Sequence, residues 1–155
     1  MKPPESNLVK ILFRFYSDIL EQETVETLWA ETVDVEMGYF RIDSIPFYVP
    51  VVATDDIVLA EYDHEHHMLI YKETVMPSGN SIVWVVIVDE ETDIDEIRAV
   101  FYSLGCDSES LSDRYYSMEV KAATNYLRIK DKLNELRSEG VIDYAEPHLS
   151  AEHQY

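Results

Sequence analysis

The stretch SIVWVVIVDEETDIDEIRAVFYSLG, Ser81–Gly105, joins a strand pattern to a helix pattern and decides the fold of the second half of the chain. The run Ile82–Val88 is apolar throughout and of strand length, which is typical of a buried strand. An amphipathic helix is expected after it, because Thr92 or Asp93 can cap the first turn and Gly105 suits the position after the last turn. The stretch therefore predicts a lobe that mixes strand and helix.

Further patterns complete this second half. Residues 114–122, RYYSMEVKA, and 141–149, VIDYAEPHL, predict strands, and residues 125–140, NYLRIKDKLNELRSEG, predict a second helix. If residues 106–112, CDSESLS, supply a short strand, the element order becomes β-α-β-β-α-β. That order is the split βαβ arrangement of ferredoxin-like domains.

The first half contains mainly strand patterns. Apolar side chains alternate from Val9 to Phe15, so one face of this strand is expected to lie in a core. Residues 17–29, SDILEQETVETLW, leave two interpretations open, a strand or a helix that turns into a strand. Pro46 and Pro50 exclude a helix from the stretch IPFYVPVV. About five short strands with close turns predict a small β-barrel or rolled sheet.

The turn MPSGNS, residues 76–81, is the clearest boundary between the two patterns, because Pro, Gly, Asn and Ser together favour a turn or linker. We therefore expect a β-rich lobe over residues 1–77 and a ferredoxin-like lobe over residues 78–155. The predicted fold class is α+β, with an N-terminal small β-barrel or rolled sheet followed by a β-α-β-β-α-β lobe.

The 155-residue chain carries a formal net charge of −19, from 31 acidic and 12 basic residues. This charge disfavours nucleic acid and anionic membranes as partners, because both are bound through Lys and Arg. It would instead accelerate the encounter with a basic protein surface. The alternative is that the charge only maintains solubility.

The expected location is the cytoplasm. The opening residues 1–7, MKPPESN, lack the apolar run of a secretory signal, and the run Ile82–Val88 is far too short to cross a membrane. Cys106 is the only cysteine, which excludes an internal disulfide and a thiolate-rich zinc cluster. We expect no cofactor, because the chain lacks a phosphate-binding glycine loop and a dinucleotide-binding fingerprint.

The stretch EYDHEHHML, residues 61–69, gathers three of the five histidines. On an extended segment His64 and His66 would share a face and could supply two ligands to a metal. A catalytic zinc needs a third ligand, and the stretch also lies where a hairpin must turn, so an exposed polar turn is the favoured interpretation. A pH-sensing role for these histidines is a further alternative. Catalysis by Cys106 is not expected, because the neighbouring Asp107 disfavours a thiolate.

Eleven tyrosines are many for a chain of this size. Aromatic side chains anchor protein interfaces, so we consider a partner-binding set. Its members are Tyr39, Phe47, Tyr48, Tyr115 and Tyr116. The alternative is that these aromatics fill the core of a small protein.

Five stretches carry a resemblance to a known family: VKILFRFYSD, ETLWAETV, SIPFYVPVVATDDIVLAEYD, SGNSIVWVVI and EGVIDYAEPHL. Their succession resembles an uncharacterised bacterial family, a domain of unknown function, over nearly the whole chain. The resemblance implies no activity and no catalytic residues.

The sequence leads to a non-enzymatic, acidic protein-binding module as the first hypothesis, of an immunity or inhibitory type that covers a basic partner. Steering by carboxylates and anchoring by tyrosines would provide the mechanism. A small-molecule sensor or regulatory domain is the second hypothesis and rests on fold analogy. An enzyme is the third, and no catalytic residue is predicted. The sequence leaves a homo-oligomer open.

Overall fold

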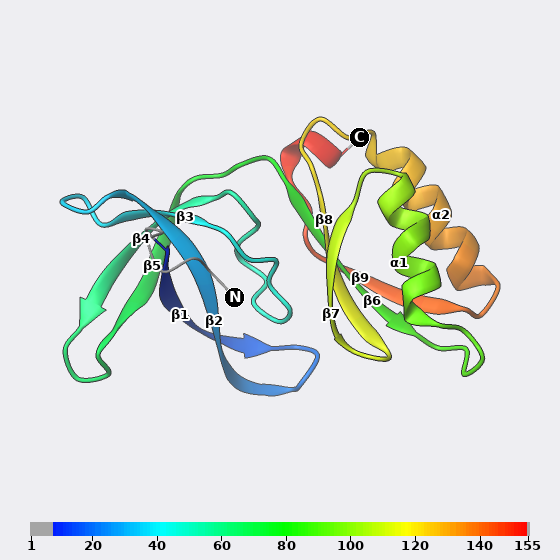
Figure 1. Cartoon of the computed structure of the whole chain (residues 1–155), viewed down its shortest axis with the longest axis horizontal. Helices are drawn as coiled ribbons and strands as arrows, with labels where there is room; N and C mark the ends of the chain where they lie inside the picture. Colours follow the sequence, from blue (N-terminus) through cyan, green and yellow to red (C-terminus); the bar gives the residue numbers. More distant parts are fainter. Residues whose placement is uncertain (1–7, 155) are drawn as a thin grey trace. The chain divides into compact units, whose positions relative to one another are not determined.

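The computed structural model describes residues 8–154 and divides the chain into two compact units, Met1–Ser78 and Gly79–Tyr155 (Figure 1). Each unit has its own hydrophobic core. The segment MKPPESN, used above for the location, lies outside the described residues. None of the helices within residues 8–154 is long and apolar enough to span a bilayer. Residues 8–154 are mostly β with two α-helices, which confirms the α+β class.

Five strands make up the first unit: β1 Leu8–Ser17, β2 Gln22–Asp34, β3 Tyr39–Ile42, β4 Ile57–Asp63 and β5 Met68–Met76. Each strand pairs with the next in antiparallel fashion, and β1 pairs again with β5. This last pairing is parallel, because the first and the fifth strands of an alternating series run in the same direction. The pairing order therefore closes on itself.

The alternating pattern of β1 places its apolar residues as expected. Ile11 and Phe13 are buried, and Val9 and Phe15 pack against the same core. Residues 17–29 contain no helix: β1 and β2 form one long hairpin around a turn that follows Ser17, which pairs with Gln22. The helix alternative is wrong, because apolar residues at every second position of β2, such as Leu28 and Ala30, fill this core.

A carboxylate organises the loop between β3 and β4. The side chain of Glu26, on β2, accepts hydrogen bonds from three consecutive backbone N–H groups: those of Phe47 (2.8 Å), Tyr48 (2.9 Å) and Val49 (2.9 Å). The loop has no ladder of its own here, so Glu26 supplies the acceptors that a partner strand would otherwise provide. As the two prolines predict, this stretch contains no helix.

A second carboxylate fixes the end of the first unit. Asp56 is fully buried and accepts from the backbone N–H groups of Ala53, at 3.0 Å, and Ser78, at 2.8 Å. The Ser78 hydroxyl in turn donates to the carbonyl oxygen of Thr54. The turn after β5 is therefore held by a buried carboxylate whose oxygens bind main-chain donors.

The second unit consists of β6 Ser81–Ile87, α1 Ile94–Ser103, β7 Asp107–Ser112, β8 Tyr115–Val120, α2 Tyr126–Ser138, β9 Ile142–His148 and the short 3-10 helix Ala151–His153. Its antiparallel sheet has the order β7-β8-β6-β9. Both helices cover the same face of this sheet (Figure 1). The short strand over CDSESLS is present as β7.

The α1 helix follows its sequence signals closely. The Asp93 side chain caps it by accepting from the N–H of Asp95, and Ile97 and Phe101 face the core. The β6 strand, joined to this cap by residues 88–92, places Val83 and Val85 under the helices. Thr92 instead donates its hydroxyl to Asp89, so Asp93 is the residue that caps the helix.

His153 anchors the end of the described chain. Its Nε2 lies 3.0 Å from the carbonyl oxygen of Lys121, and its Nδ1 lies 2.6 Å from the hydroxyl of Ser81. A carbonyl only accepts, so Nε2 donates to it, and in the neutral imidazole Nδ1 then accepts from the Ser81 hydroxyl. Both side chains are buried, so this Ser-His pair fixes the last turn and does not present a nucleophile to solvent.

We predict that Glu26→Ala lowers the free energy of unfolding by about 2–4 kcal/mol, because three main-chain donors lose a charged acceptor. Urea-induced unfolding followed by circular dichroism measures the change. Glu23→Ala, an exposed carboxylate on the same strand, is the control and is expected to change stability by less than about 0.5 kcal/mol. Equal effects of the two substitutions would contradict the role given to Glu26.

Candidate functional site

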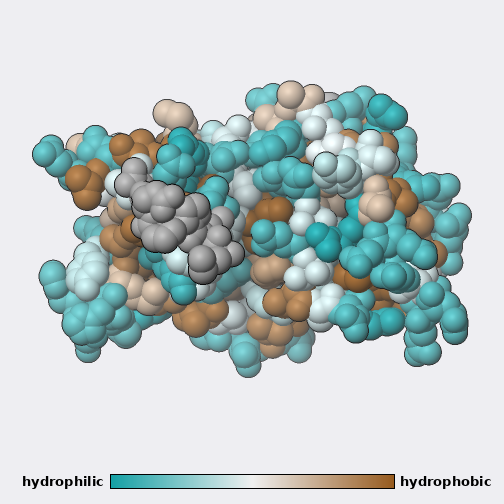
Figure 2. Space-filling view, in the orientation of Figure 1, coloured by the Kyte–Doolittle hydropathy of each residue, from teal (hydrophilic) through white to brown (hydrophobic). Residues whose placement is uncertain are grey.

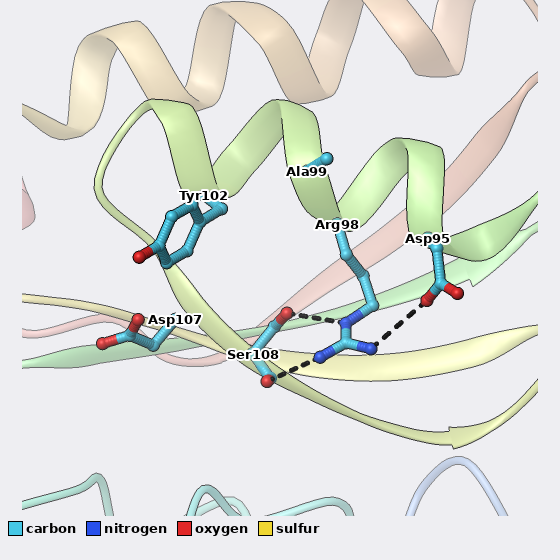
Figure 3. A pocket seen from close by; sticks show the side chains of 6 residues that line it. All are labelled: Asp95, Arg98, Ala99, Tyr102, Asp107 and Ser108. Atoms are coloured by element: carbon cyan, nitrogen blue, oxygen red, sulfur yellow. Dashed lines mark hydrogen bonds and ion pairs between the residues drawn. The ribbon is translucent and has the colours of Figure 1, made fainter.

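A groove of about 390 Å³ lies between α1 and β7 in the second unit (Figure 3). It is lined by Asp95, Arg98, Ala99, Tyr102, Asp107 and Ser108. In the close-up view the Arg98 side chain crosses from the helix to the strand, between Asp95 and Ser108. The first four of these residues come from α1 and the other two from β7, so the helix and the strand form its two walls.

Arg98 makes three polar contacts across this groove. Its Nε donates to the Ser108 hydroxyl at 2.9 Å, and its Nη2 donates to the Ser108 carbonyl oxygen, also at 2.9 Å. Its Nη1 lies 3.4 Å from a carboxylate oxygen of Asp95. The Ser108 carbonyl is therefore directed toward α1 and away from the neighbouring strand β8.

The β7 strand is at the edge of the sheet. Within residues 8–154 it pairs only with β8, in a register that sets Ser108 opposite Met118 and Ser110 opposite Tyr116. Backbone groups of alternate residues point to the same side of a strand, so those of Ser110 are directed outward as those of Ser108 are. An open edge of this kind is a template on which another strand can pair.

The chain segment that supplies both walls of the groove is strongly acidic. The segment Asp89–Asp113 contains nine carboxylates and one cation, Arg98. The α2 helix, in contrast, carries four cations and two carboxylates. Asp95 is 75% exposed and Tyr102 is 70% exposed, so a charge and an aromatic ring are both available beside the groove. The drawn face of the second unit is mostly hydrophilic (Figure 2).

A separate cluster occupies the turn between β4 and β5, where the sequence suggests His64 and His66 as metal ligands. His66 Nδ1 lies 2.5 Å from Asp63, and His66 Nε2 lies 3.3 Å from the Arg14 guanidinium. His64 instead packs edge-on against the ring of Tyr62. The two histidines therefore have different neighbours.

The atoms that come together here are those of Asp63, Glu65 and His66, whose potential ligand atoms lie within 4.8 Å of one another. Both nitrogens of His66 already have neighbours, and one of these is the cationic Arg14. A metal ion bound through Nε2 would have to displace this guanidinium, and one bound through Nδ1 would have to replace the hydrogen bond to Asp63. As expected of a hairpin connection, the segment is a turn.

The aromatic set proposed from the sequence does not form one exposed surface. Tyr116 is fully buried in the core beneath the helices, so it is unable to touch a partner and leaves the set. Phe47, Tyr48 and Tyr115 are half-buried, and each is already engaged within the chain. Tyr39 is half-buried on β3. Of the two interpretations of these aromatic residues, core packing is therefore the one that applies to Tyr116.

Cys106 is also buried in the core of the second unit. Burial raises the pKa of its thiol to about 12, and the carboxylates of Asp107 and Glu119 add to the increase. The thiolate is the reactive form of cysteine, so burial and the raised pKa both disfavour reaction at this residue.

A family comparison matches residues 26–144 to a profile described as Domain of unknown function (DUF4265). The chain belongs to this DUF4265 family. A solved structure described as a hypothetical protein from Neisseria gonorrhoeae is similar, with a TM-score of 0.78, over 92% of this chain and 95% of that chain. The two share 23% sequence identity, so the likeness shows the fold alone. No curated protein matches the sequence.

The groove of this DUF4265 protein was not among the sites suggested by its sequence. Arg98, Tyr102 and Ser108 are ordinary helix and strand residues in the one-dimensional pattern. One signal was available: Arg98 is the single cation between Asp89 and Asp113. A lone cation in such a segment is expected to have a specific acceptor, but sequence spacing alone does not identify Ser108.

We predict that His66→Ala raises the pKa of Asp63. The hydrogen bond to His66, and then the N–H of Glu65, hold the pKa of this carboxyl below its ordinary value. Its contribution to stability is thus present above the unfolded-state pKa and is lost as pH falls through the lowered folded-state pKa. Carboxyl NMR titration measures the shift, with His64→Ala as the control. An unchanged Asp63 titration in the His66 variant would contradict this assignment.

Proposed function

We propose that this protein is a non-enzymatic, acidic binding module that docks the basic surface of another protein through the groove between α1 and β7. The observation that carries the proposal is an open sheet edge within a chain segment, Asp89–Asp113, that contains nine carboxylates and one cation. Binding would cover the partner's basic surface, as an inhibitory or immunity-type protein does.

Electrostatics and anchoring have separate roles in this proposal. The carboxylates beside the groove attract a basic partner over about 8–10 Å at physiological ionic strength and raise the association rate. The exposed ring of Tyr102 then provides apolar contact with a hydroxyl at its tip, a combination that interfaces favour. Association should therefore weaken as salt is added.

Small-molecule sensing is the second candidate function. Two further depressions, of about 400 and 440 Å³, are lined mainly by charged side chains such as Arg14, Lys72 and Arg128. Small-molecule sites are usually more apolar and more enclosed, so these surfaces favour protein binding over ligand sensing. An enzyme remains the third candidate. Tyr116 and Tyr126 have a raised pKa because they are buried, which makes them poor acid-base catalysts at neutral pH.

We also propose an architecture for each of the two units. The cyclic pairing of the five N-terminal strands supports a small β-barrel, and the order β7-β8-β6-β9 with two helices on one face supports a ferredoxin-like lobe. We place the domain boundary between residues 77 and 78, next to the division between the compact units. The proposed location is the cytoplasm, with which a single free thiol is compatible.

We predict that neutralising the groove selectively removes partner binding. The test variant is Asp95→Asn/Asp107→Asn/Glu109→Gln, and the matched control is Glu23→Gln/Glu36→Gln/Glu73→Gln on the first unit. Each triple variant removes three negative charges, from −19 to −16. A basic protein retained from lysate of the source organism at low salt is identified and purified, and its Kd is measured against all three chains.

The groove variant is expected to bind at least about tenfold more weakly, while the control stays within about twofold of the unchanged chain. Equal weakening of both variants would mean that only the total charge matters. If the chain retains no protein from the lysate beyond what an equally acidic control protein retains, the binding function itself is overturned.

A further inference from the structure

We propose that the partner binds as an added strand, an extended basic segment that pairs with the open edge of β7 beneath α1. This inference rests on the proposed function and specifies its mode. The segment would carry Lys or Arg at every second position and small or aliphatic residues between them. Strand addition of this kind supplies affinity through main-chain hydrogen bonds and specificity through alternate side chains.

The backbone of β7 offers the required groups. The Ser108 carbonyl faces the groove, as its bond with Arg98 shows, and the backbone groups of Ser110 point the same way. Ser110 and Ser112 are exposed. An incoming strand can therefore reach two successive outward-facing residues, Ser108 and Ser110, which is the spacing at which sheet ladders repeat.

Arg98 currently occupies the place of this strand. Its Nη2 donates to the Ser108 carbonyl as the N–H of an added strand would. The guanidinium is part-exposed and has Asp95 as a second partner, so it can leave Ser108 without becoming an unpaired buried charge. Arg98 thus acts as a displaceable cover that satisfies the edge while the partner is absent.

The carboxylates of β7 indicate which side chains the added segment would carry. Ser108 directs its hydroxyl toward Arg98 on α1, so the next residue, Glu109, extends from the opposite face of the strand. A Lys or Arg side chain on that face of an added strand would lie beside Glu109, and Asp107, which lines the groove at the start of β7, offers a second carboxylate. Opposite charges on neighbouring strands stabilise pairing. On the α1 side, the small Ala99 and the exposed Tyr102 leave room for aliphatic residues (Figure 3).

A second copy of this chain is the competing occupant. Its β7 and the turn after it would bring Asp107, Glu109 and Asp113 of one copy against the same residues of the other. Like charges opposite one another destabilise strand pairing, and each copy carries a net charge of −19. The same carboxylates that repel a second copy attract a basic segment, so the observations favour the heterologous partner.

The test uses the full chain and a defined probe, acetyl-VKVKVKV-amide, with the block peptide acetyl-KKKVVVV-amide as a control of equal charge and composition. Two further probes carry N-methyl groups. In one probe they replace the N–H hydrogens of every valine except the first, and in the other those of the three lysines. The valine and lysine N–H groups lie on opposite edges of an extended peptide, and only one edge faces β7, so one methylated probe should bind at least tenfold more weakly and the other should not. The sensitive set also gives the strand direction.

Two protein variants complete the test. Arg98→Ala should bind the alternating probe more tightly, several-fold in Kd, because it removes the donor that competes for Ser108. Arg114→Ala removes the same charge from an exposed arginine bound to the Val88 carbonyl and should leave the Kd within about twofold. Amide exchange at Ser108 and Ser110 should slow at least tenfold on addition of the probe.

The outcomes separate the two proposals. Equal effects of both N-methylated sets, or equal affinity for the alternating and the block peptides, overturn strand addition. If the partner captured from lysate still depends on the groove carboxylates in that case, the binding function stands with another mode. A dimer that forms without peptide and protects the amides of Ser108 and Ser110 would overturn the basic segment in favour of a second copy.

Discussion

A shortage of cations constrains this structure throughout. With 31 carboxylates and 12 basic side chains, most acidic groups have no side-chain counterion available. The carboxylates that organise the fold bind main-chain N–H groups instead. Glu26 holds three of them, Asp56 holds two, and Asp93 caps α1. Charged hydrogen bonds to backbone donors thus replace much of the ion pairing that a more balanced chain would use.

Local signals predict much of the secondary structure because each depends on neighbouring residues. Alternation identifies β1, and a capping Asp with a following Gly105 bounds α1. Residues 17–29 allow two predictions, because the spacing of their apolar residues suits both a helix and a strand. Only the core beneath β2 decides between the two. The Glu26 loop was not predictable either, since a carboxylate contacts residues more than twenty positions away.

The candidate site was harder to predict than the fold. Tyr116 shows the reason: it is fully buried while the adjacent Tyr115 is only half-buried, and sequence alone does not say which of the two lies in the core. The groove depends on a helix residue, Arg98, meeting the backbone of Ser108. Every residue has a backbone carbonyl, so the sequence does not indicate which carbonyl Arg98 contacts. The contact depends on the position of β7 at the edge of the sheet.

The parallel pairing of β1 with β5 has a consequence for folding. It joins Ile11 to Leu69 and Leu12 to Ile70, residues far apart in the chain, whereas the other pairings of this unit form between consecutive strands. Bringing such distant segments together costs more chain entropy than closing a hairpin. Closure between β1 and β5 therefore carries the largest chain-entropy cost among the strand pairings of the first unit.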